Sequence, residues 1–133
     1  MRRVRAFLDS HCDAEEPLAL CGDLNIAPDA RDVYDPDEWG NTVLFHPEMR
    51  AAFQSLCEWG LTDTFRCHHS EEKLYSWLDY RQLAFPKNRG VRIDHILAAQ
   101  SLAECCTRVE IDREARKGKG ASDHAPVIAE FDD

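Results

Sequence analysis

Apolar residues near the start of the chain recur at intervals of three and four positions. Val4, Phe7 and Leu8 share one face at this spacing, and Cys12 continues that face one turn later. Because 3.6 residues complete a helical turn, the pattern predicts an amphipathic helix over residues 2–12. The acidic, proline-containing sequence that follows is typical of a turn, so we expect the helix to end there.

A second amphipathic pattern lies in the middle of the chain. Phe53 and Leu56 contribute to one apolar face. Pro47 suits a first helical turn because its missing N–H would have no partner there, and Gly60 can adopt the backbone conformation that ends a helix. The sequence therefore predicts a helix over residues 47–59.

Several shorter apolar segments have the length and pattern of strands. Residues 18–21 form a continuous apolar run stopped by Gly22, which is typical of a strand buried on both faces. Residues 29–45 are rich in Asp, Pro and Gly without a regular period, and we expect a long surface loop there. Helices and strands in this order predict an α/β layered fold. The other predicted strands cover residues 61–65, 74–78, 92–98, 107–111 and 126–131.

Composition limits the class of protein. The chain has 133 residues, 44% of them hydrophobic, which suits one domain, or part of one, with a modest core. The sequence lacks both a run of about 18 apolar residues and an N-terminal apolar segment of signal-peptide length, so we expect no membrane partner and a cytoplasmic location. The six cysteines form no C-x-x-C pair and are predicted to be reduced residues of the core.

Charge is segregated along the sequence. The net charge of −9 argues at first against a polyanionic partner, because phosphate binding depends on Lys and Arg. Ten acidic residues and one basic residue lie between Asp9 and Glu38, whereas nine basic and five acidic residues lie between Arg81 and Lys119. The second segment is compatible with a basic substrate face or with an ordinary solvated surface, and charge alone does not separate the two.

Three short polar blocks lie where apolar strands give way to loops. They are residues 22–25, 92–95 and 122–126. A strand end is a rigid position from which a sheet presents polar groups to a substrate. Carboxylates beside an amide or an imidazole suit a metal-dependent phosphodiesterase, because a divalent ion held by oxygen ligands neutralises charge on the phosphate during attack. Such ligands favour Mg²⁺, with Mn²⁺ as the alternative.

Five residues of these blocks are candidates for the chemistry. Asp23 and Asn25 can point to one side of an extended segment, offering a carboxylate for water or metal and an amide for a phosphoryl oxygen. Asp123 supplies a metal ligand next to His124, which can carry a proton. Asp94 lies in an apolar strand and needs a partner for burial, so we predict a pair in which its carboxylate orients the imidazole of His124.

Each block also has a purely structural explanation. Gly-Asp-x-Asn is a common turn sequence, in which Asp23 and Asn25 would bond to backbone donors. Ser122 and Asp123 favour helix caps and turns. Asp94 is equally compatible with a buried carboxylate that is hydrogen-bonded and has no further role.

Residues 75–81 combine aromatic side chains with an arginine. Trp77 alone would more often belong to a core than to a binding surface. Its combination with Arg81 is typical of segments that stack on nucleobases and pair with phosphates, so we predict that both residues bind substrate, together with Arg89.

The order and flanks of these motifs resemble the C-terminal half of bacterial exonuclease III, an apurinic/apyrimidinic endonuclease family of the endonuclease/exonuclease/phosphatase superfamily. The resemblance implies half of a four-layer α/β sandwich, with a mixed, mostly antiparallel sheet and flanking helices. It also implies that residues 1–133 lack the first half of the domain, which normally supplies an asparagine, a metal-binding glutamate and a catalytic tyrosine. It extends over essentially the whole chain, through residues 22–28, 59–66, 75–81, 88–94, 102–106 and 122–127.

The resemblance implies roles for the matching residues. Asp23 would activate the attacking water, Asn25 would bind the scissile phosphate, and Asp123 would ligate Mg²⁺. His124, oriented by Asp94, would contact and stabilise the phosphate. The expected metal site thus involves Asp23, Asn25, Asp123 and His124.

The substrate expected from the resemblance is duplex DNA. Trp77 lies where the family packs an aromatic side chain against an extrahelical abasic sugar. The expected activity is Mg²⁺-dependent hydrolysis, by incision 5′ to abasic sites and by degradation from 3′ ends. The alternative is a catalytically inactive fragment or a module that retains DNA binding. Half a sandwich would also expose an apolar sheet face, so we expect marginal stability or self-association.

Overall fold

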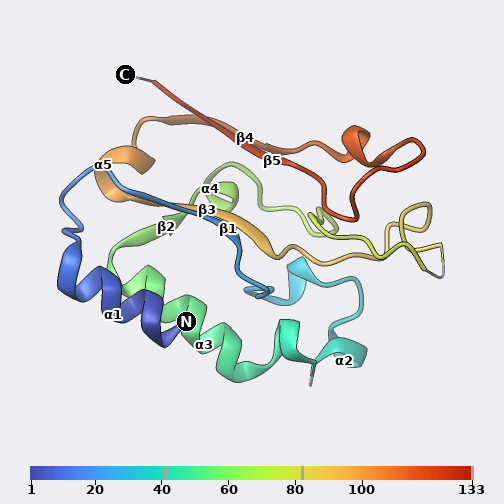
Figure 1. Cartoon of the computed structure of the whole chain (residues 1–133), viewed down its shortest axis with the longest axis horizontal. Coiled ribbons are helices and arrows are strands. Elements are labelled where there is room, and N and C mark those ends of the chain that lie inside the picture. Colours follow the sequence, from blue (N-terminus) through green and yellow to red (C-terminus); the bar gives the residue numbers. More distant parts are fainter. Residues whose placement is uncertain (41, 82, 133) are drawn as a thin grey trace.

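A three-stranded sheet carries helices on one face and a two-stranded ribbon on the other (Figure 1). The structure is a computed structural model that describes residues 1–40, 42–81 and 83–132. In the sheet, β1 (Ala19–Asp23) and β2 (Leu61–Asp63) flank β3 (Asp94–Ala99), and both pairings are antiparallel. The ribbon pairs β4 (Cys106–Ile111) with β5 (Val127–Phe131), also antiparallel. The helices are α1 (Arg2–His11), α2 (Pro36–Trp39), α3 (Pro47–Trp59), α4 (Thr64–His68) and α5 (Gln100–Ala103), with 3₁₀ turns at Ala30–Asp32, Val43–Phe45 and Arg113–Arg116.

The core lies between the sheet and helices α1 and α3. Leu8 of α1 meets Phe53 and Leu56 of α3, and all three pack with Leu61 and Leu97 of the sheet in one buried cluster. These positions recur on one face of each helix, so packing removes a continuous apolar stripe from water. Burial of this stripe holds both helices on the same face of the sheet.

The long periodic segments confirm the predictions. The helices predicted over residues 2–12 and 47–59 are present as α1 and α3, and Gly60 follows α3 with a φ of +134°. The strands predicted over residues 92–98, 107–111 and 126–131 are present as β3, β4 and β5. Their bounds differ from the predicted ones by two residues at most.

The prediction that residues 18–21 are buried on both faces is wrong. The strand in this region, β1, runs on to Asp23 and lies at an edge of the sheet, bonded to β3 on one side. Of its residues, only Leu20 is even partly buried. A short apolar run favours a strand. Whether other elements cover that strand depends on segments far away in the sequence, so the run itself does not show whether the strand is buried.

Two predicted strands are replaced by other structure. Residues 61–65 divide between β2 and the start of α4. Residues 74–78 form no regular strand, and Trp77 instead makes isolated antiparallel bridges with Val91 and His124. The apolar residues at 74–78 therefore belong to a segment that lies between Val91 and His124, and not to a strand of a sheet.

The predicted loop over residues 29–45 contains two 3₁₀ turns and α2. Asp29 accepts a hydrogen bond from the backbone N–H of Arg31, and Asp35 accepts one from the backbone N–H of Glu38. Asp and Pro start helices here. Both residue types are also frequent in loops, which is why the segment was predicted to be a loop.

Two expectations from composition can be compared with the structure. None of the six cysteines, which all belong to the described residues, forms a disulfide, but none is fully buried and Cys21 and Cys67 are exposed. Cys12 and Cys57 do pack against the core between the sheet and helices α1 and α3, whereas the core placement of Cys21 and Cys67 was wrong. Among the described residues, no helix has the length and apolar character needed to cross a membrane.

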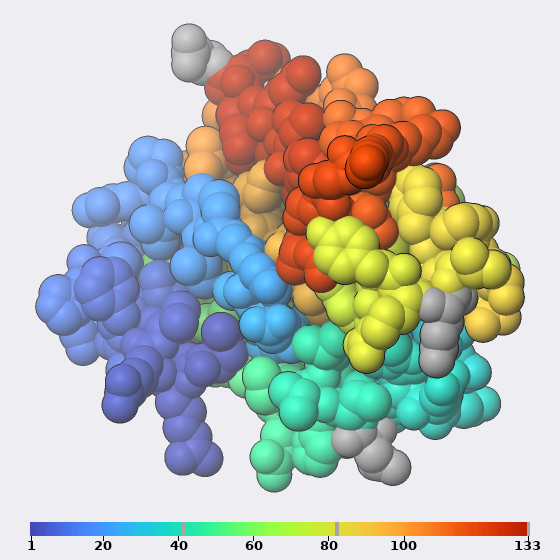
Figure 2. Space-filling view, turned by 45° about the vertical axis from the view of Figure 1, so that its right-hand side comes forward, coloured from blue at the N-terminus to red at the C-terminus, as the bar shows by residue number. Residues whose placement is uncertain are grey.

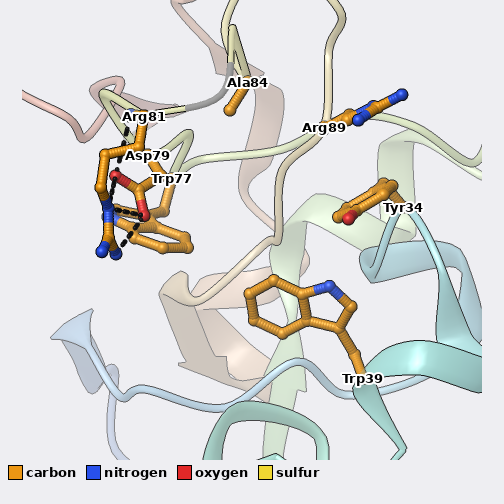
Figure 3. A pocket seen from close by; sticks show the side chains of 7 residues that line it. All are labelled: Tyr34, Trp39, Trp77, Asp79, Arg81, Ala84 and Arg89. Carbon is orange, nitrogen blue, oxygen red and sulfur yellow. Dashed lines mark hydrogen bonds and ion pairs between the residues drawn. The ribbon is translucent and has the colours of Figure 1, made fainter.

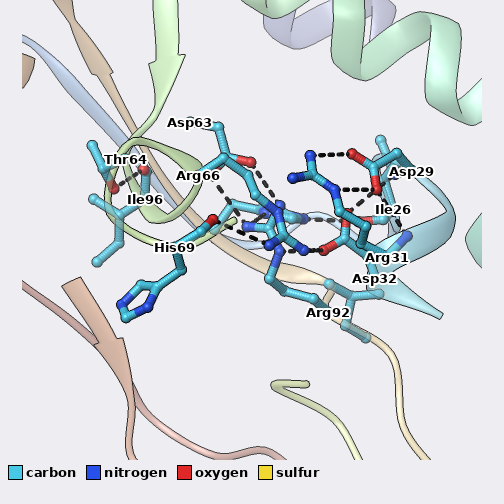
Figure 4. A network of polar contacts seen from close by, with 12 residues as sticks. Ile26, Asp29, Arg31, Asp32, Asp63, Thr64, Arg66, His69, Arg92 and Ile96 are labelled. Atoms are coloured by element: carbon cyan, nitrogen blue, oxygen red, sulfur yellow. Dashed lines mark hydrogen bonds and ion pairs between the residues drawn. The ribbon is translucent and has the colours of Figure 1, made fainter. Parts of the chain in front are cut away.

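A buried network of ion pairs joins three segments of the chain (Figure 4). Arg92, whose side chain is 1% exposed, donates from Nε to Asp32 and from Nη2 to Asp63, each at 2.7 Å. Arg66 adds a second cation to Asp32 at 2.5 Å. Asp32 belongs to the first 3₁₀ turn, Asp63 ends β2, and Arg92 lies two residues before the start of β3. The network therefore fixes where β3 begins.

His95 continues this network into the core. Burial, followed by the charge of Arg92, lowers the pKa of His95. The ring Nε2 bonds to the carbonyl of Ile26 at 2.8 Å, so that nitrogen carries the proton, while Nδ1 accepts from Nη1 of Arg92 at 3.2 Å. A neutral ring with both nitrogens bonded accounts for a histidine that is only 2% exposed.

Replacing Arg92 should test how much this network stabilises the fold. In Arg92→Met, the buried carboxylate of Asp32 and the partly buried carboxylate of Asp63 lose a shared cation, and we expect the free energy of unfolding in urea to fall by roughly 3–5 kcal/mol. The matched control is Arg108→Met, which breaks an exposed pair with Glu110 and should cost roughly 0–1 kcal/mol. Equal losses in the two variants would contradict a special role for the network.

Candidate active site

Asp94 and His124 form a hydrogen-bonded pair between the first residue of β3 and the loop before β5. Nδ1 of His124 donates to Oδ2 of Asp94 at 2.8 Å. The hydroxyl of Ser122 accepts the backbone N–H of His124 at 3.1 Å, and the bridge between Trp77 and His124 holds the loop in place. The pair predicted from the sequence is present, and its catalytic role stays a prediction.

Asp23 lies directly opposite Asp94 in the antiparallel register of β1 and β3. Its Oδ2 is 3.8 Å from Nε2 of His124. Its Oδ1 accepts the backbone N–H of Asn25 at 2.9 Å, and Asn25 has a φ of +54°, a left-handed conformation that asparagine tolerates better than most residues. The Gly-Asp-x-Asn motif is therefore a turn, and this turn leaves the second oxygen of Asp23 facing His124.

Asp123 is held by Trp77. The indole N–H of Trp77 donates to Oδ2 of Asp123 at 3.0 Å, and the backbone carbonyl of Asp123 accepts from the N–H of Leu78 at 3.0 Å. Oδ1 of Asp123 lies 4.0 Å from Nε2 of His124. The carboxylates of Asp23 and Asp123 thus both approach the imidazole nitrogen that Asp94 leaves free.

The electrostatic environment raises the pKa of His124. Partial burial acts in the opposite direction, but the hydrogen bond to Asp94 and the negative charges of Asp94, Asp23 and Asp123 outweigh it. The imidazole consequently stays protonated to a higher pH than an isolated histidine. In that form Nε2 is a donor that can bind an anionic oxygen.

Asp94 and His124 line a cleft of about 450 Å³ between β1 and the loop before β5 (Figure 2, light blue and orange-red). Among the described residues, Asp23, Asp94 and His124 offer ligand atoms that lie within 4.8 Å of one another. The sequence-based metal set contained Asn25 and Asp123 in place of Asp94. Oxygen donors predominate in both sets, so the donor chemistry fits a hard divalent cation. The cleft is lined by Cys21, Gly22, Asp94, His95, Ile96, Ser122, His124, Ala125, Pro126 and Val127.

Ser76 is a residue of the site that sequence reasoning missed. Its buried hydroxyl accepts the backbone N–H groups of Ile93 and Asp94, each at 3.0 Å. Its carbonyl accepts the N–H of Ala125, next to His124, at 2.7 Å. One residue therefore holds the backbone on both sides of the Asp94–His124 pair. A serine in an apolar segment gives no sequence signal for such a role.

Trp77, Arg81 and Arg89, predicted to bind substrate, line one pocket (Figure 3). Tyr34 and Trp39 also line it, and they come from the segment that was predicted to be a loop. The pocket borders the active site because Trp77 belongs to both. In the sequence, Tyr34 and Trp39 flank an Asp-Pro pair that starts a helix. This pair could have indicated that the two aromatic residues lie close together, but it was interpreted as part of a loop.

The two arginines of this pocket differ in their partners. Arg81 forms three side-chain bonds to Asp79, the shortest 2.7 Å long, which raise the pKa of the guanidinium and lower that of the carboxyl. Arg89 instead lies over the ring of Tyr34, 6.0 Å from its centroid. Arg89 is therefore the more available cation for a phosphate.

Comparison with known proteins identifies relatives of the chain. The model of the endonuclease/exonuclease/phosphatase family matches residues 2–124. Exodeoxyribonuclease III of Haemophilus influenzae is 42% identical over 135 residues, covering 96% of this chain and 51% of that protein. An AP endonuclease structure from Archaeoglobus fulgidus superposes with a TM-score of 0.94 at 37% identity, over 98% of this chain and 51% of its own. A Neisseria 3′ phosphatase bound to a product DNA hairpin gives a TM-score of 0.88 at 42% identity, over 97% and 49% of the two chains.

The chain therefore belongs to the endonuclease/exonuclease/phosphatase family of enzymes. This confirms the resemblance drawn from the motifs, and the structural matches confirm the α/β class with antiparallel strands and flanking helices. The chain spans about half the length of these relatives.

Removing the charge of Asp94 should lower the pKa of His124. In Asp94→Asn, burial remains and the strongest partner that opposes it is lost, so we expect the His124 pKa to fall below that of the metal-free wild-type protein. An NMR titration of the His124 ring measures this directly. Because the folded-state pKa is raised in the wild type, the pair stabilises the fold fully below about pH 6.5, and this stabilisation is lost as pH rises through the folded value. An unchanged His124 pKa in the variant would contradict the pairing, and Asp37→Asn, on the surface of α2, is the control.

Removing the Ser76 hydroxyl should disturb the site as well as the fold. Ser76→Ala leaves two buried N–H groups without an acceptor, at a cost of about 1–3 kcal/mol in unfolding free energy. The matched control is Thr64→Val. This variant removes a hydroxyl that donates at 2.6 Å to the carbonyl of Ile96, which lies in β3 like Asp94. We expect both variants to be less stable and only Ser76→Ala to lower the His124 pKa. If the two variants have the same His124 pKa, Ser76 stabilises the fold but does not position the Asp94–His124 pair.

Proposed function

We propose that the chain supplies catalytic residues of a divalent-metal-dependent DNA phosphodiesterase of the exodeoxyribonuclease III and AP endonuclease kind. The observation that carries the proposal is the convergence of Asp23, Asp94 and His124 at one end of the sheet, with ligand atoms within 4.8 Å of one another. Asp123, held by Trp77, adjoins this cluster. Membership of a family of phosphoester-cleaving enzymes supports the same chemistry.

In this proposal each residue acts through the geometry already described. Asp23 takes a proton from the attacking water, since one of its oxygens is bound in the turn and the other lies 3.8 Å from Nε2 of His124. Asn25, placed beside it by that turn, donates from its amide to a phosphoryl oxygen. His124 donates from Nε2 to an anionic oxygen of the phosphate, and Asp94 keeps the imidazole oriented and protonated.

The expected metal is Mg²⁺, with Mn²⁺ as the alternative. Asp23, Asn25 and Asp123 would hold it, and Asp94 is close enough to contribute. His124 belonged to the expected ligand set, but Nε2 is its one nitrogen that is not bonded to Asp94, and in this proposal that nitrogen donates to the phosphate and does not bind the ion. When bound, the ion neutralises the negative charge that builds on the phosphate during attack. A predominance of carboxylate donors favours these hard cations over zinc.

The proposed substrate is duplex DNA with abasic sites or 3′ ends. The names of the relatives support this, since they include an exodeoxyribonuclease, an AP endonuclease and a 3′ phosphatase bound to a DNA hairpin. In the chain itself, Trp77 offers an aromatic face and Arg81 and Arg89 offer cations in one pocket. Of the two arginines, Arg89 should contribute more, because Asp79 neutralises Arg81.

Residues from outside this chain would complete the site. The chain spans about half the length of its relatives, and we propose that it corresponds to the second half of a two-halved domain with the site between the halves. Self-association through an exposed face of the half-sandwich, and a cytoplasmic location, remain part of this proposal. A binding module without turnover is the competing function.

Cleavage of a duplex oligonucleotide with one abasic-site analogue tests the proposal. The chain is assayed with Mg²⁺, alone and grafted in place of the matching 135 residues of the Haemophilus influenzae relative. We expect the graft to nick the strand, EDTA to abolish nicking, and Asp23→Asn to reduce the rate at least 100-fold, consistent with loss of a general base.

The control is Asp37→Asn, an exposed carboxylate on α2, which should leave the rate unchanged. Nicking by the chain alone would show that it needs no further residues. Nicking by the graft only would support a site completed from outside the chain. A folded graft that binds DNA without metal-dependent nicking would overturn the proposal in favour of a binding module.

A further inference from the structure

We propose that the pocket lined by Tyr34, Trp39 and Trp77 binds an intact, unstacked nucleobase of the DNA strand, with Arg89 binding the attached phosphate. The inference rests on the proposed function in taking DNA as the substrate. It goes further, because the resemblance to exonuclease III implies only a contact between Trp77 and a sugar that has lost its base.

The walls of the pocket are aromatic. Trp39 lies between Tyr34 and Trp77, with ring centroids 6.1 Å and 6.4 Å away and interplanar angles of 73° and 71° (Figure 3). Edge-to-face pairs of this kind hold the rings in place while leaving parts of their faces uncovered. All three side chains are partly exposed rather than buried. The surface they form is suited to a flat, apolar ring, and every base has such a face.

The polar groups around the pocket suit a nucleotide. Within the described part of the chain, the indole N–H of Trp39 has no hydrogen-bond partner, so it can donate to a base carbonyl or ring nitrogen. Arg89 forms no ion pair with a described residue, and its guanidinium lies over the ring of Tyr34. The carboxylate of Asp79, the acidic residue in the lining, is neutralised by Arg81. A neutral base can therefore accept a hydrogen bond from Trp39, and the attached anionic phosphate can pair with Arg89.

The size of the pocket favours one base. Its volume is about 210 Å³, below the roughly 300–1,000 Å³ of clefts that hold drug-sized ligands. A base can enter, but two stacked nucleotides cannot. A sugar without its base would leave much of the aromatic surface in water.

The position of the pocket relates it to the active site. Trp77 donates to Asp123, and its backbone bridges His124 on one side and Val91 on the other. Gly90 permits this close approach, since a Cβ there would lie 2.6 Å from the carbonyl oxygen of Trp77. A base held against Trp77 therefore lies one side chain away from the proposed metal ligands. The base would position its own nucleotide for hydrolysis.

Fluorescence quenching of the tryptophans by mononucleotides tests the proposal without cleavage. The chain has three tryptophans, and Trp59→Phe in α3 leaves only the two that line the pocket. We expect dAMP to quench this emission saturably and deoxyribose 5-phosphate to bind at least tenfold more weakly. Trp39→Leu should weaken dAMP about tenfold, as expected for the loss of one stacking partner.

A second variant separates loss of the pocket from loss of the fold. Arg89→Gln alters an exposed side chain and should weaken dAMP binding while leaving binding of the uncharged nucleoside deoxyadenosine unchanged. Equal quenching by dAMP and deoxyribose 5-phosphate, or unchanged dAMP binding in a folded Trp39→Leu chain, would overturn the proposal. Neither outcome depends on nuclease activity, so the proposed function can fail separately.

Duplex oligonucleotides then identify the source of the base. One carries an unpaired base at its 3′ end, one carries a single-base bulge, and one is blunt and fully paired. Tighter binding of the first than of the blunt duplex would assign the pocket to the terminal nucleotide, and tighter binding of the second to an internal extrahelical one. No preference for either over the blunt duplex would contradict a base-binding pocket.

Discussion

The buried guanidinium of Arg92 is the constraint on which the rest of the structure depends. A cation that is 1% exposed is tolerated only where carboxylates reach it, and Asp32 and Asp63 do so at 2.7 Å each. These partners come from the turn after β1 and from the end of β2, so satisfying one charge fixes two segments against the start of β3. Asp94 follows two residues later, and its position is set by this network rather than by its own contacts alone.

The candidate site is built from four segments that meet at one end of the sheet. Antiparallel register places Asp23 opposite Asp94, and the bridge between Trp77 and His124 brings in the loop before β5. Ser76 bonds to the backbone on both sides of the Asp94–His124 pair. The proposed chemistry needs one oriented imidazole among carboxylates. The fold provides this orientation through hydrogen bonds to the backbone, which is stiffer than the side chains.

Agreement between sequence and structure follows the range of the interactions involved. The helix over residues 47–59 was predictable because its periodicity and end signals are local. The Asp94–His124 pair was also predictable, because a carboxylate in an apolar strand needs a partner and few candidates exist. The exposure of β1, the wedged segment around Trp77 and the role of Ser76 were not predictable, since each depends on which distant segment lies alongside.

The sequence by itself determined the secondary-structure elements with strong periodicity and the family, and it singled out the candidate site residues, because these depend on residue type and spacing. Only the tertiary structure decided that Asp23 joins the Asp94–His124 pair in one cluster, that Arg81 is neutralised while Arg89 is available, and that Tyr34 and Trp39 join Trp77 in a pocket. The reason is physical. Distances between side chains are set by burial and register across segments far apart in the chain, and neither quantity is encoded at a single position.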